Sequence, residues 1–92
     1  MPKIEIKQSH KVTAAEAKTK LDALNKDLAD KYGLTSKWQS ETVATVERTG
    51  ASGTIKIAPS EVVINLDLSF ALTPIKGKVE EKIKEELRKL FG

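Results

Sequence analysis

The residues that could do chemistry in this chain are few, and they do not form a catalytic set. His10 is the single histidine and there is no cysteine, so a typical zinc site and a thiol nucleophile both lack their residues. Ser9 directly precedes His10, and neighbours in a strand point to opposite faces, so the two do not pair as nucleophile and base. We therefore expect His10 to be a surface or strand-end residue, and we expect no enzyme activity, cofactor or metal.

Two other patterns resemble chemical sites but are better explained by structure. The glycine-rich segment 50–53 lacks the lysine of a phosphate-binding loop and leads into a predicted strand, so we interpret residues 49–53 as a hairpin turn. The glutamate pairs at 80–81 and 85–86 alternate with lysine and arginine. Oppositely charged residues three or four apart are typical of a solvated helix face.

Four residues remain as candidates for binding a partner. Trp38 could stack on a ligand or a base, with packing beneath the first helix as the favoured alternative. Lys76 and Lys78 lie at the start of the last predicted helix, where positive charge opposes the helix dipole and an anionic partner would be favourable. Arg48 is a further basic candidate. The alternative for all three basic side chains is simple solvation.

The elements that must position these residues are clearest in the last third of the chain. Apolar residues recur at every second position over 62–70, which predicts a strand with Phe70 on its buried face. From residue 75 they recur at helical spacing, which predicts a helix with this buried stripe: Ile75, Val79, Ile83, Leu87 and Leu90. Pro74 stands at the change of period, where the first turn of a helix tolerates it.

The first two thirds predict one helix among short strands. Residues 3–7 alternate as a strand, and Thr13 with Glu16 is a capping-box signature for a helix that ends at Gly33. Residues 34–40 and 41–48 favour strand, either as two strands or as one bent strand, and 54–58 follows the turn as another. The predicted order is β-α-β-β-β-α: an α+β fold with a mostly antiparallel four-stranded sheet and two helices on one face.

Composition limits the kind of protein this is. Residues 1–92 are expected to form one domain, with 39% hydrophobic and 32% charged residues and a formal net charge of +3. No apolar run approaches the ~18 residues of a membrane span, and the first residues lack a signal-peptide core, so we expect a cytoplasmic protein. The mild positive charge permits an anionic partner without requiring one.

Taken together, several segments are similar to the polyhydroxyalkanoic acid system family of small bacterial proteins. The resemblance runs over nearly the whole chain and is carried by the following stretches: Met1–Ile6 with Ser9 and His10, Ala15–Ala17, Asp30–Leu34 with Trp38, Glu47–Ile55, and Leu68–Gly77. The chain departs from the family pattern at Ala44 and Val46, where bulkier apolar residues are expected. The resemblance implies a role in polyhydroxyalkanoate storage and carries over no catalytic residue.

Three functions follow as hypotheses. The first is a non-enzymatic accessory protein that binds the polyester granule, a granule protein or a second copy of itself, through the uncovered sheet face or a sheet edge. The second is an RNA- or ribosome-binding module, by analogy with the strand order of ribosome hibernation factors. The third is a binder of a small apolar hydroxyacyl ligand.

Overall fold

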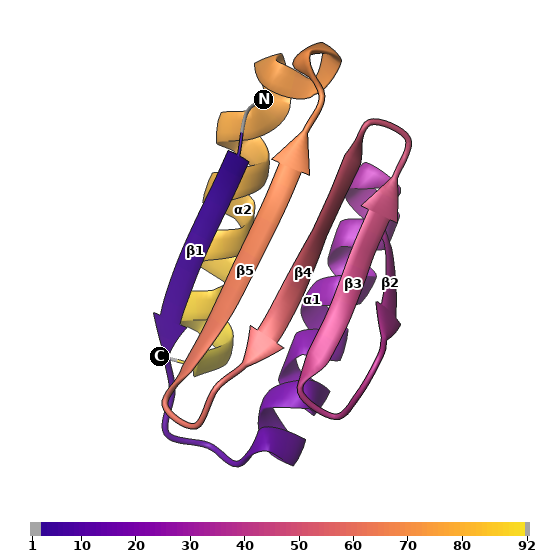
Figure 1. The fold of residues 1–92 in the computed structure, drawn as a ribbon. Coiled ribbons are helices and arrows are strands. Elements are labelled where there is room, and N and C mark those ends of the chain that lie inside the picture. The colour runs from indigo at the N-terminus through magenta and orange to yellow at the C-terminus, as the bar shows by residue number, and fades with distance from the viewer. Residues whose placement is uncertain (1–2, 92) are drawn as a thin grey trace.

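The computed structural model describes residues 3–91 and shows one sheet covered on one side by two helices (Figure 1). The elements are β1 (Lys3–Ser9), α1 (Ala14–Tyr32), β2 (Thr35–Trp38), β3 (Val43–Arg48), β4 (Ala51–Ile57), β5 (Glu61–Leu68), the 3₁₀ helix η1 (Phe70–Leu72) and α2 (Thr73–Phe91). The strands are antiparallel and lie in the order β1-β5-β4-β3-β2. The predicted α+β class is confirmed, with five strands in place of four.

The additional strand comes from the segment that could have been one bent strand. β2 and β3 form a hairpin in which Trp38 lies opposite Ala44. The Ser40 hydroxyl oxygen accepts hydrogen bonds from the amides of Thr42 and Val43 at 3.3 and 3.2 Å. A short polar side chain that bonds the backbone ahead of it stabilises a turn rather than an extended strand.

The turn between β3 and β4 is shorter than predicted. It consists of Thr49 and Gly50, and Gly50 has a φ of 84°, a conformation that glycine adopts at little cost. The prediction of a turn through Gly53 is wrong, because β4 already begins at Ala51. Gly53 is a strand residue that pairs with Leu66, and a Cβ there would collide with the backbone oxygen of Asn65. The second glycine therefore serves close packing in the sheet.

The long β5 strand buries one face in the core as predicted, except at its end. Its alternate side chains are 3% exposed or less: Val62, Ile64, Leu66 and Leu68. Phe70 does not continue this buried face, because the strand ends at Leu68 and the chain turns into η1, leaving Phe70 75% exposed. On α2, Val79, Ile83 and Leu87 are buried against the sheet, whereas Ile75 and Leu90 are partly buried.

Both ends of α1 match the sequence signals. The Thr13 side chain accepts a hydrogen bond from the Glu16 amide at 3.2 Å and so caps the first turn. Gly33 has a φ of 69°, and its N–H donates to the carbonyl oxygen of Ala29 at 3.1 Å. This left-handed glycine closes the last turn of the helix.

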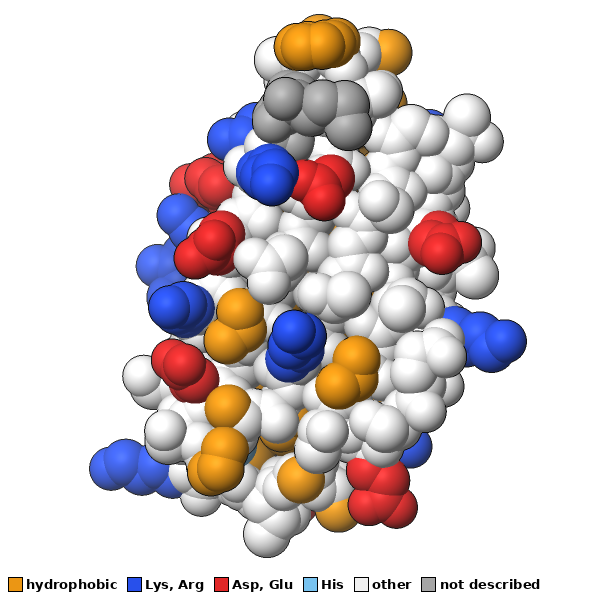
Figure 2. All heavy atoms as spheres, viewed as in Figure 1, with side chains coloured by type: hydrophobic (Ala, Val, Ile, Leu, Met, Phe, Trp, Pro, Cys, Tyr) orange, Lys and Arg blue, Asp and Glu red, His pale blue; other side chains and the backbone are white. Residues whose placement is uncertain are grey.

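The sheet face opposite the helices is polar. Each strand alternates, so one face holds the core and the other holds rows of side chains that cross all five strands. Two such rows are Lys3–Asp67–Ser52–Glu47–Thr35 and Glu5–Asn65–Thr54–Thr45–Lys37. Figure 2 shows this face, where uncharged polar groups and backbone fill the middle and isolated hydrophobic side chains are interspersed. It is not an extended apolar surface.

Candidate interaction site

One end of the molecule carries an exposed aromatic side chain on a well-anchored turn. The Ser69 amide donates to the carbonyl oxygen of Gly50 at 2.7 Å, which fixes the start of η1 against the β3–β4 turn. The Leu72 amide donates to the Ser69 carbonyl oxygen at 3.0 Å, and the Leu72 side chain packs against the core. Phe70 projects from this support, and hydrophobic side chains are visible there at the top of Figure 2. We call η1, the Thr49–Gly50 turn and residues 73–78 the Phe70 end.

Two of the four candidate binding residues lie at the Phe70 end, and a third, Arg48, adjoins it. Lys76 is half-buried and Lys78 is exposed in the first turns of α2, and the first turn of that helix contains no acidic residue. Arg48 directly precedes the turn that holds η1, and it lines a shallow hollow together with Ser69 and Asp67. Its Nη1 also donates to the Tyr32 carbonyl oxygen at 2.6 Å, so Arg48 additionally ties β3 to the end of α1.

Trp38 is separate from this group. It lies at the far end of the β2–β3 hairpin, opposite Ala44, whereas Arg48 ends β3. Its indole Nε1 donates to Asp22 Oδ1 at 2.7 Å, and the Lys18 ammonium lies 5.3 Å from the ring centroid. The side chain is half-buried and packs on the core, so the favoured alternative of packing against the first helix describes its position.

His10 is a structural residue at the end of a strand, which is one of its two predicted positions, and it is buried rather than on the surface. It directly follows β1 but is 5% exposed. The Val12 amide donates to its Nδ1 at 3.3 Å, so the proton lies on Nε2, which donates to the Ala58 carbonyl oxygen at 2.8 Å. Its ring is 5.7 Å from that of Phe91. Both ring nitrogens are therefore used: Nε2 joins the end of β1 to the end of β4, and Nδ1 holds the backbone that follows β1.

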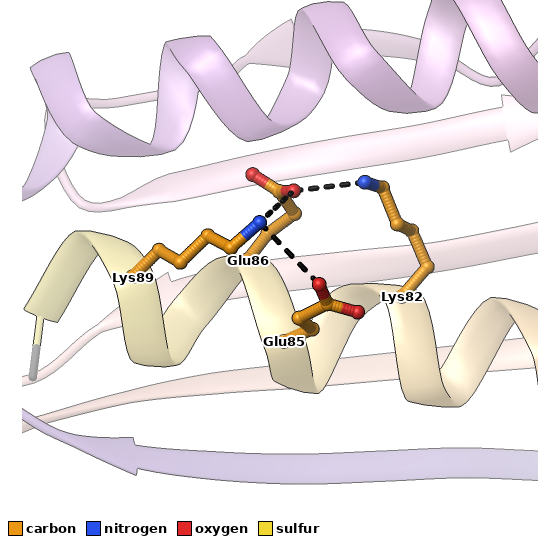
Figure 3. Close-up of polar contacts among 4 residues, drawn as sticks. All are labelled: Lys82, Glu85, Glu86 and Lys89. Carbon is orange, nitrogen blue, oxygen red and sulfur yellow. Dashed lines mark hydrogen bonds and ion pairs between the residues drawn. The ribbon is translucent and has the colours of Figure 1, made fainter.

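The strongest ionic contacts run along α2 where it faces α1 (Figure 3). Lys82 Nζ is 2.8 Å from Glu86 Oε1, and Lys89 Nζ lies 3.3 Å from Glu85 and 4.0 Å from Glu86. The hydrogen bond from Lys82 lowers the pKa of the Glu86 carboxyl, and the same bond raises the pKa of Lys82. Lys31 on α1 has its pKa lowered by the neighbouring Lys82. The ion pairs link successive turns of α2, and Lys31 of α1 lies close enough to Lys82 for the two groups to influence each other.

One of the surface hollows is unsuited to an apolar acyl chain. A hollow of about 430 Å³ lies between β1 and α2, and its lining is largely charged or polar: Glu5, Ile6, Lys7, Gln8, Glu81, Lys84 and Arg88. Within residues 3–91, no three histidine or acidic side chains gather in a group that could hold a metal ion. No helix in that same range is long and apolar enough to cross a membrane.

Phe70 is the site residue that sequence reasoning missed. It continues the period-two pattern of β5, so periodicity alone placed it in the core. The available contrary signal was local: Ser69 before it and Thr73-Pro74 after it mark a segment where a strand gives way to a helix. A phenylalanine inside such a junction need not keep the strand's alternation.

The fold and these surfaces define a small α+β protein, with one antiparallel sheet, two helices on one face and a basic, aromatic-tipped end. A family model whose description reads "Putative polyhydroxyalkanoic acid system protein" matches residues 4–91. The chain belongs to this polyhydroxyalkanoic acid system family, as its sequence resemblance indicated. No curated protein and no solved structure matches it.

Proposed function

We propose that this protein is a non-catalytic accessory protein of polyhydroxyalkanoate storage, located in the cytoplasm, that binds the polyester granule or a granule-bound protein. The observation that carries the proposal is the family match across residues 4–91. The engagement of both His10 ring nitrogens with the backbone supports a non-catalytic role, because the single imidazole is committed to structure.

The Phe70 end is the surface that we assign to the granule. Phe70 is the one large hydrophobic side chain that is exposed among the described residues, and burying it on an apolar surface would be favourable by about 2 kcal/mol. Lys76 and Lys78 follow it in the first turns of α2, Arg48 precedes the turn that holds η1, and these basic side chains suit an anionic layer or an acidic granule protein. The burial of Phe70 and the electrostatic attraction of the basic side chains are each weak, and together they give reversible binding to the granule surface.

The test is co-sedimentation of the purified protein with native polyester granules. We expect the wild-type protein to pellet with granules, Phe70→Ser to remain largely in solution, and Phe70→Leu to retain binding. Lys76→Glu with Lys78→Glu should weaken binding, whereas Lys56→Glu, on the uncovered sheet face, is the matched charge control. If the wild-type protein does not pellet with granules and binds ribosomal RNA instead, the RNA-binding alternative replaces this proposal.

A second copy of the chain is the other partner that we propose. The uncovered sheet face is unsuited to it, because its rows are polar and charged rather than apolar. A sheet edge is better suited, since an edge strand presents backbone groups that another strand can pair with.

A further inference from the structure

The outer edge of β1 has the features of a self-pairing strand. β1 is the terminal strand of the sheet, and within residues 3–91 no other strand pairs with its outer edge. The His10 amide donates to the Ser60 carbonyl oxygen, which continues the ladder between β1 and β5. Because bonding alternates along an antiparallel ladder, the even-numbered residues of β1 face β5. The backbone groups of Lys3, Glu5, Lys7 and Ser9 therefore point to the open edge.

The side chains of β1 are complementary to themselves in one register. When the whole strand Lys3–Ser9 overlaps an antiparallel copy of itself, a two-fold axis passes through Ile6. This full overlap places Glu5 of each copy opposite Lys7 of the other. Shifting the copy by two residues, so that the axis passes through Glu5, would instead oppose Glu5 to Glu5 and Lys3 to Lys7. The register with the most hydrogen bonds is thus also the one with matched charges.

The neighbouring face of α2 repeats this complementarity. Glu81, Lys84 and Arg88 line the same hollow as Glu5 and Lys7, so they form a stripe of α2 beside the open edge. A two-fold axis near Ile6 makes the α2 helices of the two copies antiparallel. This arrangement brings Arg88 of one copy toward Glu81 of the other. Lys84, close to the axis, has an ion pair at 3.7 Å with Glu80 of its own chain, which limits repulsion between the copies.

We infer that two copies of this chain pair through β1, antiparallel and centred on Ile6, to form a continuous ten-stranded sheet with an α2–α2 contact over the seam. This inference names the edge and register of the self-association proposed above and does not depend on granule binding. The β2 edge is less suited, because β2 has only four residues. Charged edge strands resist arbitrary pairing, and here the alternation leaves one favourable register.

The test is sedimentation velocity of the full chain and its charge variants across the micromolar range. We expect a concentration-dependent dimer in the wild type. Lys7→Glu should weaken it about tenfold or more, since each dimer then holds two like-charge pairs. Glu5→Lys should act similarly, and the exchanged variant Glu5→Lys with Lys7→Glu should restore the dimer. Lys37→Glu, on the opposite edge strand, is the matched control and should have no effect.

A cross-linking experiment fixes the register independently. The chain has no cysteine, so single variants Glu5→Cys and Lys7→Cys can be mixed and oxidised. We expect the mixed disulfide between the two variants to exceed both symmetric ones. A wild-type chain that stays monomeric, a dimer indifferent to Lys7→Glu, or an excess of symmetric disulfides would each overturn the inference. A monomer that still pellets with granules would overturn it while leaving the granule proposal intact.

Discussion

The indole nitrogen of Trp38 donates a 2.7 Å hydrogen bond to the Asp22 carboxylate, which joins the edge strand β2 to the middle of α1. We predict that Asp22→Ala lowers the free energy of unfolding by about 1 kcal/mol, because a charged acceptor is lost at a partly solvated site. Urea unfolding followed by the fluorescence of the single tryptophan measures this directly. Asp30→Ala, an exposed aspartate on the same helix, is the control and should have little effect.

Gly77 offers a stabilising substitution. It lies in α2, and a Cβ built there meets nothing within 4 Å. We predict that Gly77→Ala raises the free energy of unfolding by about 0.5–1 kcal/mol, because alanine loses less backbone entropy in a helix. Thermal and urea unfolding measure the gain. A loss of stability would show that the glycine makes a contact essential to the fold.

Gly53 should respond in the opposite way. Its position in β4 leaves no room for a side chain, since an added Cβ would also come within 2.9 Å of the Leu66 Cα. We predict that Gly53→Ala lowers the free energy of unfolding by about 2 kcal/mol or more, because the added side chain forces β4 and β5 apart. Circular dichroism through a urea titration tests it. Equal stability of the variant and the wild type would contradict the tight approach of these strands.

His10 should matter for folding rather than for activity. We predict that His10→Ala lowers the free energy of unfolding by about 2 kcal/mol, because the Ala58 carbonyl loses its donor and Phe91 loses a neighbouring ring. The readout is urea unfolding, with granule co-sedimentation as a second measurement. Selective loss of granule binding at unchanged stability would instead assign His10 to the binding site.

Glu86 should make the free energy of unfolding depend on pH. Its pKa is lowered in the folded state by the Lys82 hydrogen bond, so it contributes stability above the unfolded value of about 4.3. That contribution is lost as the pH falls through the lowered folded pKa. We predict that Glu86→Gln loses less stability than the wild type between about pH 5 and pH 3. Urea unfolding of both proteins at each pH measures the difference.

The regular parts of the fold were predictable because they depend on local chemistry. Thr13 and Gly33 bound α1 through backbone hydrogen bonds that involve only neighbouring residues. The buried residues of β5 and α2 were predicted from the spacing of apolar residues, which is every second residue in the strand and helical in α2. The sheet order could not be obtained in the same way, because the pairing of β1 with β5 depends on residues far apart in the chain. The sequence left open whether the first strand lies beside the second or the last.

The candidate site was only partly predictable for a related reason. Basic residues near Pro74 were identified from their types, but the joining of η1 to the turn after Arg48 depends on the bond between Gly50 and Ser69, which is a tertiary contact. Phe70 was misplaced because a strand pattern carries no information about where the strand stops. The burial of His10 likewise depends on Ala58 and Phe91, which lie far along the chain.

The pairing of β1 with β5 also determines the order of events as the chain is made. Ile4 and Ile6 belong to the first described strand, yet the strand that flanks them begins only at Glu61, and α2 follows later still. Until then these two isoleucines have no native cover, while α1 and the β2–β4 meander can form from sequential neighbours. Completion of the sheet therefore waits for β5, and a chain cut before Glu61 leaves exposed two isoleucines that the folded protein buries.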